Sequence, residues 1–144
     1  KSAKKERRIF SKKTSNTMKS IMRLVVSNKN GTAKQAEASG YLVGGKTGTA
    51  EKTNPAGGYF KKQNIVTLTS AFPMNNPRFI ITVMIDNSKG RKRTAGWVAA
   101  PVVNKIVTRI APILNIKPQT KSSLNFSKNL LKFKIRGKDE GANL

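Results

Sequence analysis

The stretch GYLVGGKTGTAE at residues 40–51 constrains the fold of this chain most strongly, because glycine fills four of its twelve positions. Gly40, Gly45, Lys46 and Thr47 fit the phosphate-loop pattern G-x-x-x-x-G-K-[ST] of nucleotide-binding proteins. The stretch also alternates in the manner of an extended strand. The two interpretations predict different structures, because a phosphate loop leads into a helix and a strand does not.

The residues on either side of the stretch decide between these interpretations. A phosphate loop follows a buried strand and opens a helix, whose free N–H groups and dipole hold the phosphate. Here the polar sequence AKQAEAS precedes Gly40, and a glycine, a proline and two further glycines follow Thr47 within a dozen residues. Asp86 is only a formal candidate for an acidic magnesium ligand. We therefore reject the phosphate loop and predict a strand.

A glycine-rich strand at this position suits a particular kind of ligand. Where side chains are missing from one edge, an extended ligand can lie along the backbone and pair with it as an added strand does. Lys46 offers a positive charge, and Thr47 and Thr49 offer hydroxyl groups. These groups suit an acyl substrate that ends in a carboxylate. The alternative is a purely structural strand packed under a helix, with Lys46 extended into solvent.

The remaining pattern predicts an α+β fold in which helices flank an antiparallel sheet of three or more strands. Strands are expected at residues 41–50, 65–72 and 79–85. The short turn at residues 73–77 makes the last two strands an antiparallel hairpin. Because the segment 79–85 is apolar on both faces, we expect both faces of that strand to be covered.

Two helices are expected, one before and one after these strands. Apolar residues at helical spacing predict a helix that starts with Thr14 or Ser15 as its cap and ends near Asn28. Its apolar face is Met18, Ile21, Met22 and Val25. The second helix is expected from about residue 97 to residue 110, with Trp97 in the core and Pro112 ending the helix.

The charge of the chain favours a second class of function. With 29 Lys and Arg against 6 Asp and Glu, the net charge is +23, and such a chain is attracted to polyanions. The alternative function is therefore a basic polyanion- or nucleic-acid-binding module that uses Lys89, Arg91, Lys92, Arg93 and the C-terminal tail. Lys outnumbers Arg 21 to 8 and aromatic residues are few, so we expect no specific nucleic-acid recognition.

The residue types that are missing exclude several kinds of chemistry. The chain has no Cys and no His, which excludes disulfides, a cysteine-type zinc site and histidine acid–base catalysis. We expect no metal site and no cofactor.

Several segments in the same order resemble the C-terminal part of a class B penicillin-binding protein, of the cell-division peptidoglycan D,D-transpeptidase type. These segments are GYLVGGKTGTAE at 40–51, SAFPMNNP at 70–77, TAGWVAAPVV at 94–103 and the helix sequence at 11–26. The similarity runs from about residue 8 to residue 118. Lys46, Thr47 and Gly48 form the K-T-G element of such serine acyl-transferases.

The resemblance implies roles for the residues of this element. Lys46 is implied as the catalytic lysine, and Thr47, Gly48 and Thr49 as the substrate-binding residues. The N–H of Thr49 is implied as half of an oxyanion hole. Strict alternation puts Lys46 on the face opposite Thr47 and Thr49. We therefore expect them to meet only through backbone groups, strand twist or an edge position.

The resemblance also implies partners and a location. The implied ligands are a peptidoglycan stem peptide and β-lactams, bound together with the rest of the domain. The implied protein partners are the missing N-terminal half of that domain and division proteins. The implied location is the bacterial cell envelope, at the periplasmic face of the inner membrane.

The family also uses an S-x-x-K nucleophile and an S-x-N motif ahead of K-T-G, and this chain has no convincing copy of either. Ser2–Lys5 spells the first within a charged terminus, and Ser123–Asn125 and Ser127–Asn129 spell the second after K-T-G. We expect a C-terminal transpeptidase segment at residues 9–118, between a basic disordered end at 1–8 and a basic tail at 119–144. Alone it is expected to be inactive, as a partial domain or a remnant.

Overall fold

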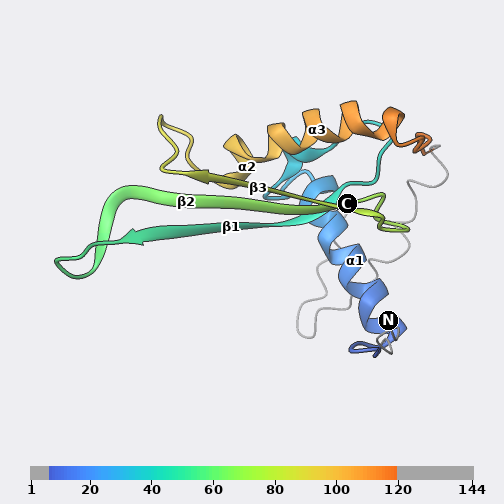
Figure 1. Cartoon of the computed structure of the whole chain (residues 1–144), viewed down its shortest axis with the longest axis horizontal. Helices are drawn as coiled ribbons and strands as arrows, with labels where there is room; N and C mark the ends of the chain where they lie inside the picture. Colours follow the sequence, from blue (N-terminus) through green and yellow to red (C-terminus); the bar gives the residue numbers. More distant parts are fainter. Residues whose placement is uncertain (1–6, 120–144) are drawn as a thin grey trace, which may run out of the picture.

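The computed structural model describes residues 7–119, apart from the side chain of Lys62. It confirms the α+β class, with an antiparallel sheet and flanking helices (Figure 1). The elements in chain order are α1 (Lys12–Ser27), the short 3-10 helix η1 (Lys34–Ala36), β1 (Gly44–Thr53), β2 (Tyr59–Phe72), β3 (Phe79–Asp86), α2 (Ala95–Val98) and α3 (Ala100–Ile113). Within residues 7–119, no helix has the length and apolar character needed to cross a membrane. The expected disordered end and basic tail lie almost entirely outside the described residues.

The three strands form one sheet in the order β1-β2-β3, and both pairings are antiparallel. The predicted hairpin of β2 and β3 is therefore confirmed. β2 begins at Tyr59, earlier than expected, because its first half pairs with the far end of β1. This pairing makes a long two-stranded arm that extends beyond the helices (Figure 1). In the described part of the chain β1 pairs only with β2, so its other edge is open.

The core lies between one face of the sheet and the C-terminal helices. Val66, Leu68 and Phe72 of β2 are buried in one cluster with Val103 and Val107 of α3. Figure 1 shows α2 and α3 along this face, while α1 projects from the start of β1 to the other side. Burying one face of an antiparallel sheet is the usual arrangement, and it fixes which side chains of each strand point inward.

The expectation that both faces of the third strand are covered is wrong. Ile81 and Val83 pack against the core, but Ile80 is 76% exposed and Met84 is 68% exposed. The reason is that α3 covers only one face of β3, and no described element covers the other.

The first helix differs from its prediction in its cap and its buried face. Ser11 is the cap, because its Oγ accepts from the N–H of Thr14 at 3.0 Å. The buried residues are Ser20, Arg23 and Val26, whereas Met18 and Ile21 of the expected apolar face are exposed. The helix docks on β1 through a buried charged residue, which apolar periodicity cannot predict.

The C-terminal helix is divided into α2 and α3. Pro101 lies in the first turn of α3, as expected. Pro112 lies inside the last turn, so the helix ends slightly later than predicted. Trp97 is 49% exposed and is not a core residue, because α2 turns Ala95 and not Trp97 toward the core.

Candidate functional site

The backbone of β1 presents Thr47 and Thr49 to the open edge of the sheet. The N–H of Asn87 donates to the carbonyl of Asn64 at 2.7 Å, which continues the ladder between β2 and β3. The direction of the N–H and C=O groups alternates from one residue of a strand to the next. In β2, the groups of the even-numbered residues therefore point toward β3, and the groups of the odd-numbered residues point toward β1. Lys46 is opposite Thr69 and Gly48 is opposite Thr67, so the N–H and C=O groups of Lys46 and Gly48 point toward β2. The N–H and C=O groups of Thr47 and Thr49 therefore face outward.

The side chain of Lys46 returns to this same edge. It leaves the strand on the face opposite Thr47, but its Nζ donates to the carbonyl of Thr47 at 2.7 Å. Lys46 is exposed, so the ammonium group is accessible to a ligand at the edge. Of the three ways in which these residues could meet, the structure uses two, a backbone group and the edge position.

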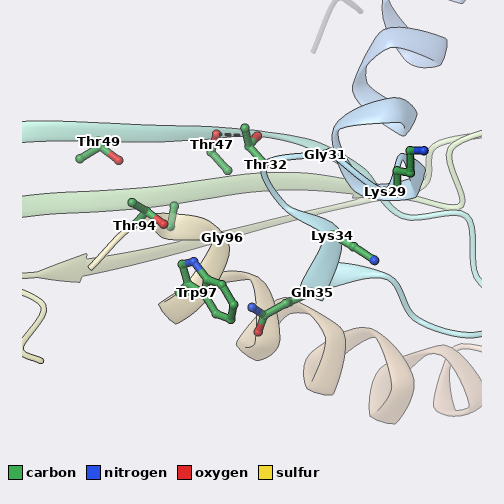
Figure 2. A pocket seen from close by; sticks show the side chains of 11 residues that line it. Lys29, Gly31, Thr32, Lys34, Gln35, Thr47, Thr49, Thr94, Gly96 and Trp97 are labelled. Atoms are coloured by element: carbon green, nitrogen blue, oxygen red, sulfur yellow. Dashed lines mark hydrogen bonds between the residues drawn. The ribbon is translucent and has the colours of Figure 1, made fainter. Parts of the chain in front are cut away.

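A cavity of about 840 Å³ lies beside this edge, on the face that α2 and α3 cover (Figure 2). Thr47 and Thr49 form one wall of it, Thr32 and Gln35 another, and Trp97 a third. Lys46 does not line the cavity. The site is thus an open strand edge with hydroxyl groups and a cavity on one side and a lysine on the other.

Thr32 and Trp97 were missed in the sequence. The Oγ1 atoms of Thr32 and Thr47 are 3.2 Å apart, within hydrogen-bond distance (Figure 2). Trp97 lies under the ammonium of Lys92, whose Nζ is 3.5 Å from the ring centroid. Both residues reach β1 only through the tertiary fold. Two sequence signals were present: Gly96, since glycine within a helix often marks a close approach of another backbone, and the family resemblance of the segment 94–103 that contains Trp97.

The glycines of β1 have a packing role that differs from the predicted one. A Cβ at Gly45 would lie 2.6 Å from the carbonyl oxygen of Thr69, and one at Gly48 would lie 2.5 Å from Oγ1 of Thr67. The missing side chains therefore let β2 approach β1, rather than only clearing the open edge for a ligand.

A buried arginine fixes the start of β1. Arg23 of α1 is 5% exposed, and its Nη1 donates to the carbonyl of Val43 at 2.7 Å. The same guanidinium binds both carboxylate oxygens of Glu37, at 2.5 and 2.7 Å. Asn104 of α3 donates to the carbonyl of Glu37. This set of contacts connects α1, α3 and the segment that enters β1.

The basic loop between β3 and α2 is folded on itself. Ser88 Oγ donates to the carbonyl of Arg93 at 3.1 Å, and Arg93 Nε donates to the carbonyl of Gly90 at 2.7 Å. Lys92 of this loop lies over one face of the Trp97 ring. Polyanion binding by this loop stays a prediction.

The structure confirms the rejection of the phosphate loop, because Lys46 and Thr47 lie within a strand and do not open a helix. The family model described as "Penicillin binding protein transpeptidase domain" matches residues 1–108. This chain belongs to the penicillin-binding protein transpeptidase family. The predicted resemblance is thereby confirmed.

Individual members of the family are similar over most of this chain. The probable peptidoglycan D,D-transpeptidase FtsI of Caulobacter vibrioides is 38% identical over 125 residues, which cover 79% of this chain and 21% of the relative. Peptidoglycan D,D-transpeptidase FtsI of Buchnera aphidicola (Schizaphis graminum) is 41% identical over 113 residues, or 78% of this chain and 20% of the relative. The chain thus spans about a fifth of the length of these relatives.

Solved structures of transpeptidases share the fold. The transpeptidase domain of penicillin-binding protein 3 from Burkholderia pseudomallei superposes with a TM-score of 0.71 at 33% identity, over 79% of this chain and 34% of that structure. Penicillin-binding protein 3 of Mycobacterium tuberculosis in complex with ampicillin superposes with a TM-score of 0.67 at 30% identity. The match covers 78% of this chain and 26% of that structure.

Proposed function

We propose that this chain supplies the substrate-binding strand of a peptidoglycan D,D-transpeptidase. In this proposal Lys46 is the catalytic lysine, and Thr47, Gly48 and Thr49 bind the substrate. The observation that carries it is the open edge of β1, where outward backbone groups of Thr47 and Thr49 meet the Lys46 ammonium. Support for β-lactam binding comes from the ampicillin and aztreonam complexes of the Mycobacterium tuberculosis neighbour.

The proposed ligand is the D-alanyl-D-alanine end of a stem peptide. An extended peptide adds to the open edge as a further strand and pairs with the backbone of Thr47 and Thr49. Its terminal carboxylate accepts hydrogen bonds from the two threonine hydroxyls and is attracted by Lys46. The N–H of Thr49 stabilises the negative charge that develops on the carbonyl oxygen in the transition state.

The proposed reaction is acyl transfer through a serine. The serine attacks the penultimate D-alanine carbonyl and expels the last D-alanine, and the amine of a neighbouring peptide then takes the acyl group. β-Lactams acylate the same serine. No S-x-x-K sequence occurs in residues 7–119, so we propose that the serine is contributed from outside this segment. The purified chain is then expected to show no stoichiometric labelling by a fluorescent penicillin.

The same proposal includes a place for the chain in the cell and in the domain. Relatives named for cell-wall transpeptidation support a position in the bacterial cell envelope, at the periplasmic face of the inner membrane. Residues 9–118 act as the transpeptidase segment, between a basic end at residues 1–8 and a basic tail at residues 119–144.

Ligand titration of the purified chain tests the proposed site. N-acetyl-D-alanyl-D-alanine is added while the amide resonances of Thr47, Gly48 and Thr49 are followed by NMR, and the C-terminal amide of the same dipeptide is titrated in parallel. The acid should shift these three resonances and bind more tightly than the amide, which lacks the carboxylate. Equal binding of the two ligands, or shifts centred elsewhere, would refute the proposal.

A further inference from the structure

The Thr47 hydroxyl lies within hydrogen-bond distance of a second threonine, which comes from the loop after α1. Thr32 precedes Thr47 by 15 residues, and the two Oγ1 atoms are 3.2 Å apart (Figure 2). A hydroxyl can donate one hydrogen bond and accept two. Whether the Thr47 hydroxyl can donate a hydrogen bond to a ligand therefore depends on whether Thr32 donates to Thr47 or accepts from it.

The backbone of Thr32 is held from both sides, although its side chain is exposed. The next residue, Ala33, donates its N–H to the carbonyl of Val25 at 3.0 Å. Before it, a Cβ at Gly31 would lie 2.4 Å from that same carbonyl oxygen. A Cβ at Gly96 would lie 2.1 Å from the carbonyl oxygen of Thr32, so α2 packs directly on this residue. These contacts set the position from which the Thr32 hydroxyl reaches β1.

A carboxylate ligand accepts hydrogen bonds and donates none, so it selects one arrangement of the two hydroxyls. If Thr47 donated to Thr32, its only hydrogen would be used and its lone pairs would face the carboxylate. If Thr32 donates to Thr47, the hydrogen of Thr47 is free for the carboxylate. A hydrogen bond accepted by a hydroxyl also polarises it and strengthens the bond that it donates.

We propose that Thr32 is a positioning residue that donates to Thr47 and thereby makes the Thr47 hydroxyl a donor to the ligand carboxylate. The proposal rests on the proposed function, because it concerns the same strand edge. Thr32 does not touch the ligand. It acts through the direction of the Thr47 hydrogen and through the rotamer of the Thr47 side chain.

Three variants of the full chain test this role. Thr32→Val removes the hydroxyl and keeps the shape of the side chain, and Thr32→Ser restores the hydroxyl. Thr82→Val is the matched control, because it breaks a similar threonine pair, Thr69 Oγ1 to Thr82 Oγ1 at 3.1 Å, on the opposite face of the sheet. Each variant is titrated with N-acetyl-D-alanyl-D-alanine and with its C-terminal amide. The χ1 rotamer populations of Thr47 are measured from scalar couplings without ligand.

Thr32→Val should weaken binding of the acid by about three- to tenfold, the usual effect of one lost hydrogen bond, and leave the weaker binding of the amide unchanged. It should also broaden the Thr47 rotamer distribution. Thr32→Ser and Thr82→Val should stay within about twofold of the unmodified chain for both ligands, which is less than the effect of one lost hydrogen bond. Loss of acid and amide binding alike would indicate a structural role and overturn the proposal.

The outcome separates the two proposals. If the unmodified chain prefers the acid and Thr32→Val keeps that preference in full, the positioning role is wrong and the proposed function stands. If the unmodified chain does not distinguish acid from amide, the proposed function fails, and the positioning role fails with it.

Discussion

The side chains of Lys46 and Thr47 leave β1 on opposite faces, and the Lys46 ammonium reaches the backbone of Thr47 because β1 is an edge strand. The Lys46 side chain bends around the edge of the strand, and its Nζ donates to the carbonyl oxygen of Thr47 at 2.7 Å. In the interior of a sheet, a neighbouring strand would occupy that space. In the proposed function, the open edge is therefore what lets adjacent residues of one strand bind a common ligand.

Lys46→Ala tests the proposed catalytic role at the scale of a single residue. In a polypeptide that includes the nucleophilic serine, acylation by a fluorescent penicillin should fall by about a hundredfold or more, because a charge that acts on the reacting groups is removed. The free energy of unfolding should change by less than about 0.5 kcal/mol, since Lys46 is exposed. Lys105→Ala, at an exposed position of α3, is the control. An unchanged acylation rate would show that the catalytic lysine lies elsewhere.

Sequence reasoning at this scale found the residues that share a strand and missed those that reach it from elsewhere. Lys46, Thr47, Gly48 and Thr49 are contiguous, so a short motif identifies them. Thr32 contacts Thr47 only through the loop that follows α1, and no periodicity encodes that contact.

The connection between α1 and β1 gives a prediction at the scale of elements. Arg23→Met should lower the free energy of unfolding by about 2–3 kcal/mol, because hydrogen bonds to the buried guanidinium are lost and the Val43 carbonyl loses this partner. Arg109→Met, at an exposed position of α3, should change it by less than about 0.5 kcal/mol. Urea unfolding followed by circular dichroism compares the two. Equal losses would argue against this set of contacts.

The pairing of β1 with β2 gives a second prediction at this scale. Gly45→Ala should cost about 1–3 kcal/mol of stability, because its Cβ would meet the backbone oxygen of Thr69 at 2.6 Å. Gly48→Ala should cost less, because its Cβ would meet a threonine hydroxyl that can rotate away. Amide hydrogen exchange along β1 and β2 measures both. A larger loss for Gly48→Ala would contradict this packing.

The types and order of the long elements were predictable, while several of their ends were not. Alternation and helical spacing identified three strands and two helices, although Met18 and Ile21 of the apolar face predicted for the first helix are exposed. The cap at Ser11 was missed because Thr14 and Ser15 are also good capping residues. The early start of β2 depends on pairing with β1, which is a tertiary contact.

For the whole molecule, the described residues leave apolar side chains uncovered. Ile80 and Met84 share the open face of the sheet, and Met18 and Ile21 are exposed on α1. Ile80→Thr combined with Met84→Thr should change the free energy of unfolding by less than about 1 kcal/mol, because neither residue is in the core. It should reduce aggregation, measured by light scattering. A large loss of stability would show that this face is covered in the free chain.

The proposed function makes this chain the K-T-G part of a working transpeptidase. The most direct test labels cells with a fluorescent penicillin and precipitates their extracts with an antibody raised against residues 1–144. We expect the penicillin label to be precipitated, on a polypeptide well above 15.8 kDa or on a chain bound to this one. If the antibody precipitates the chain and no penicillin-labelled protein accompanies it, this chain is not part of a working transpeptidase.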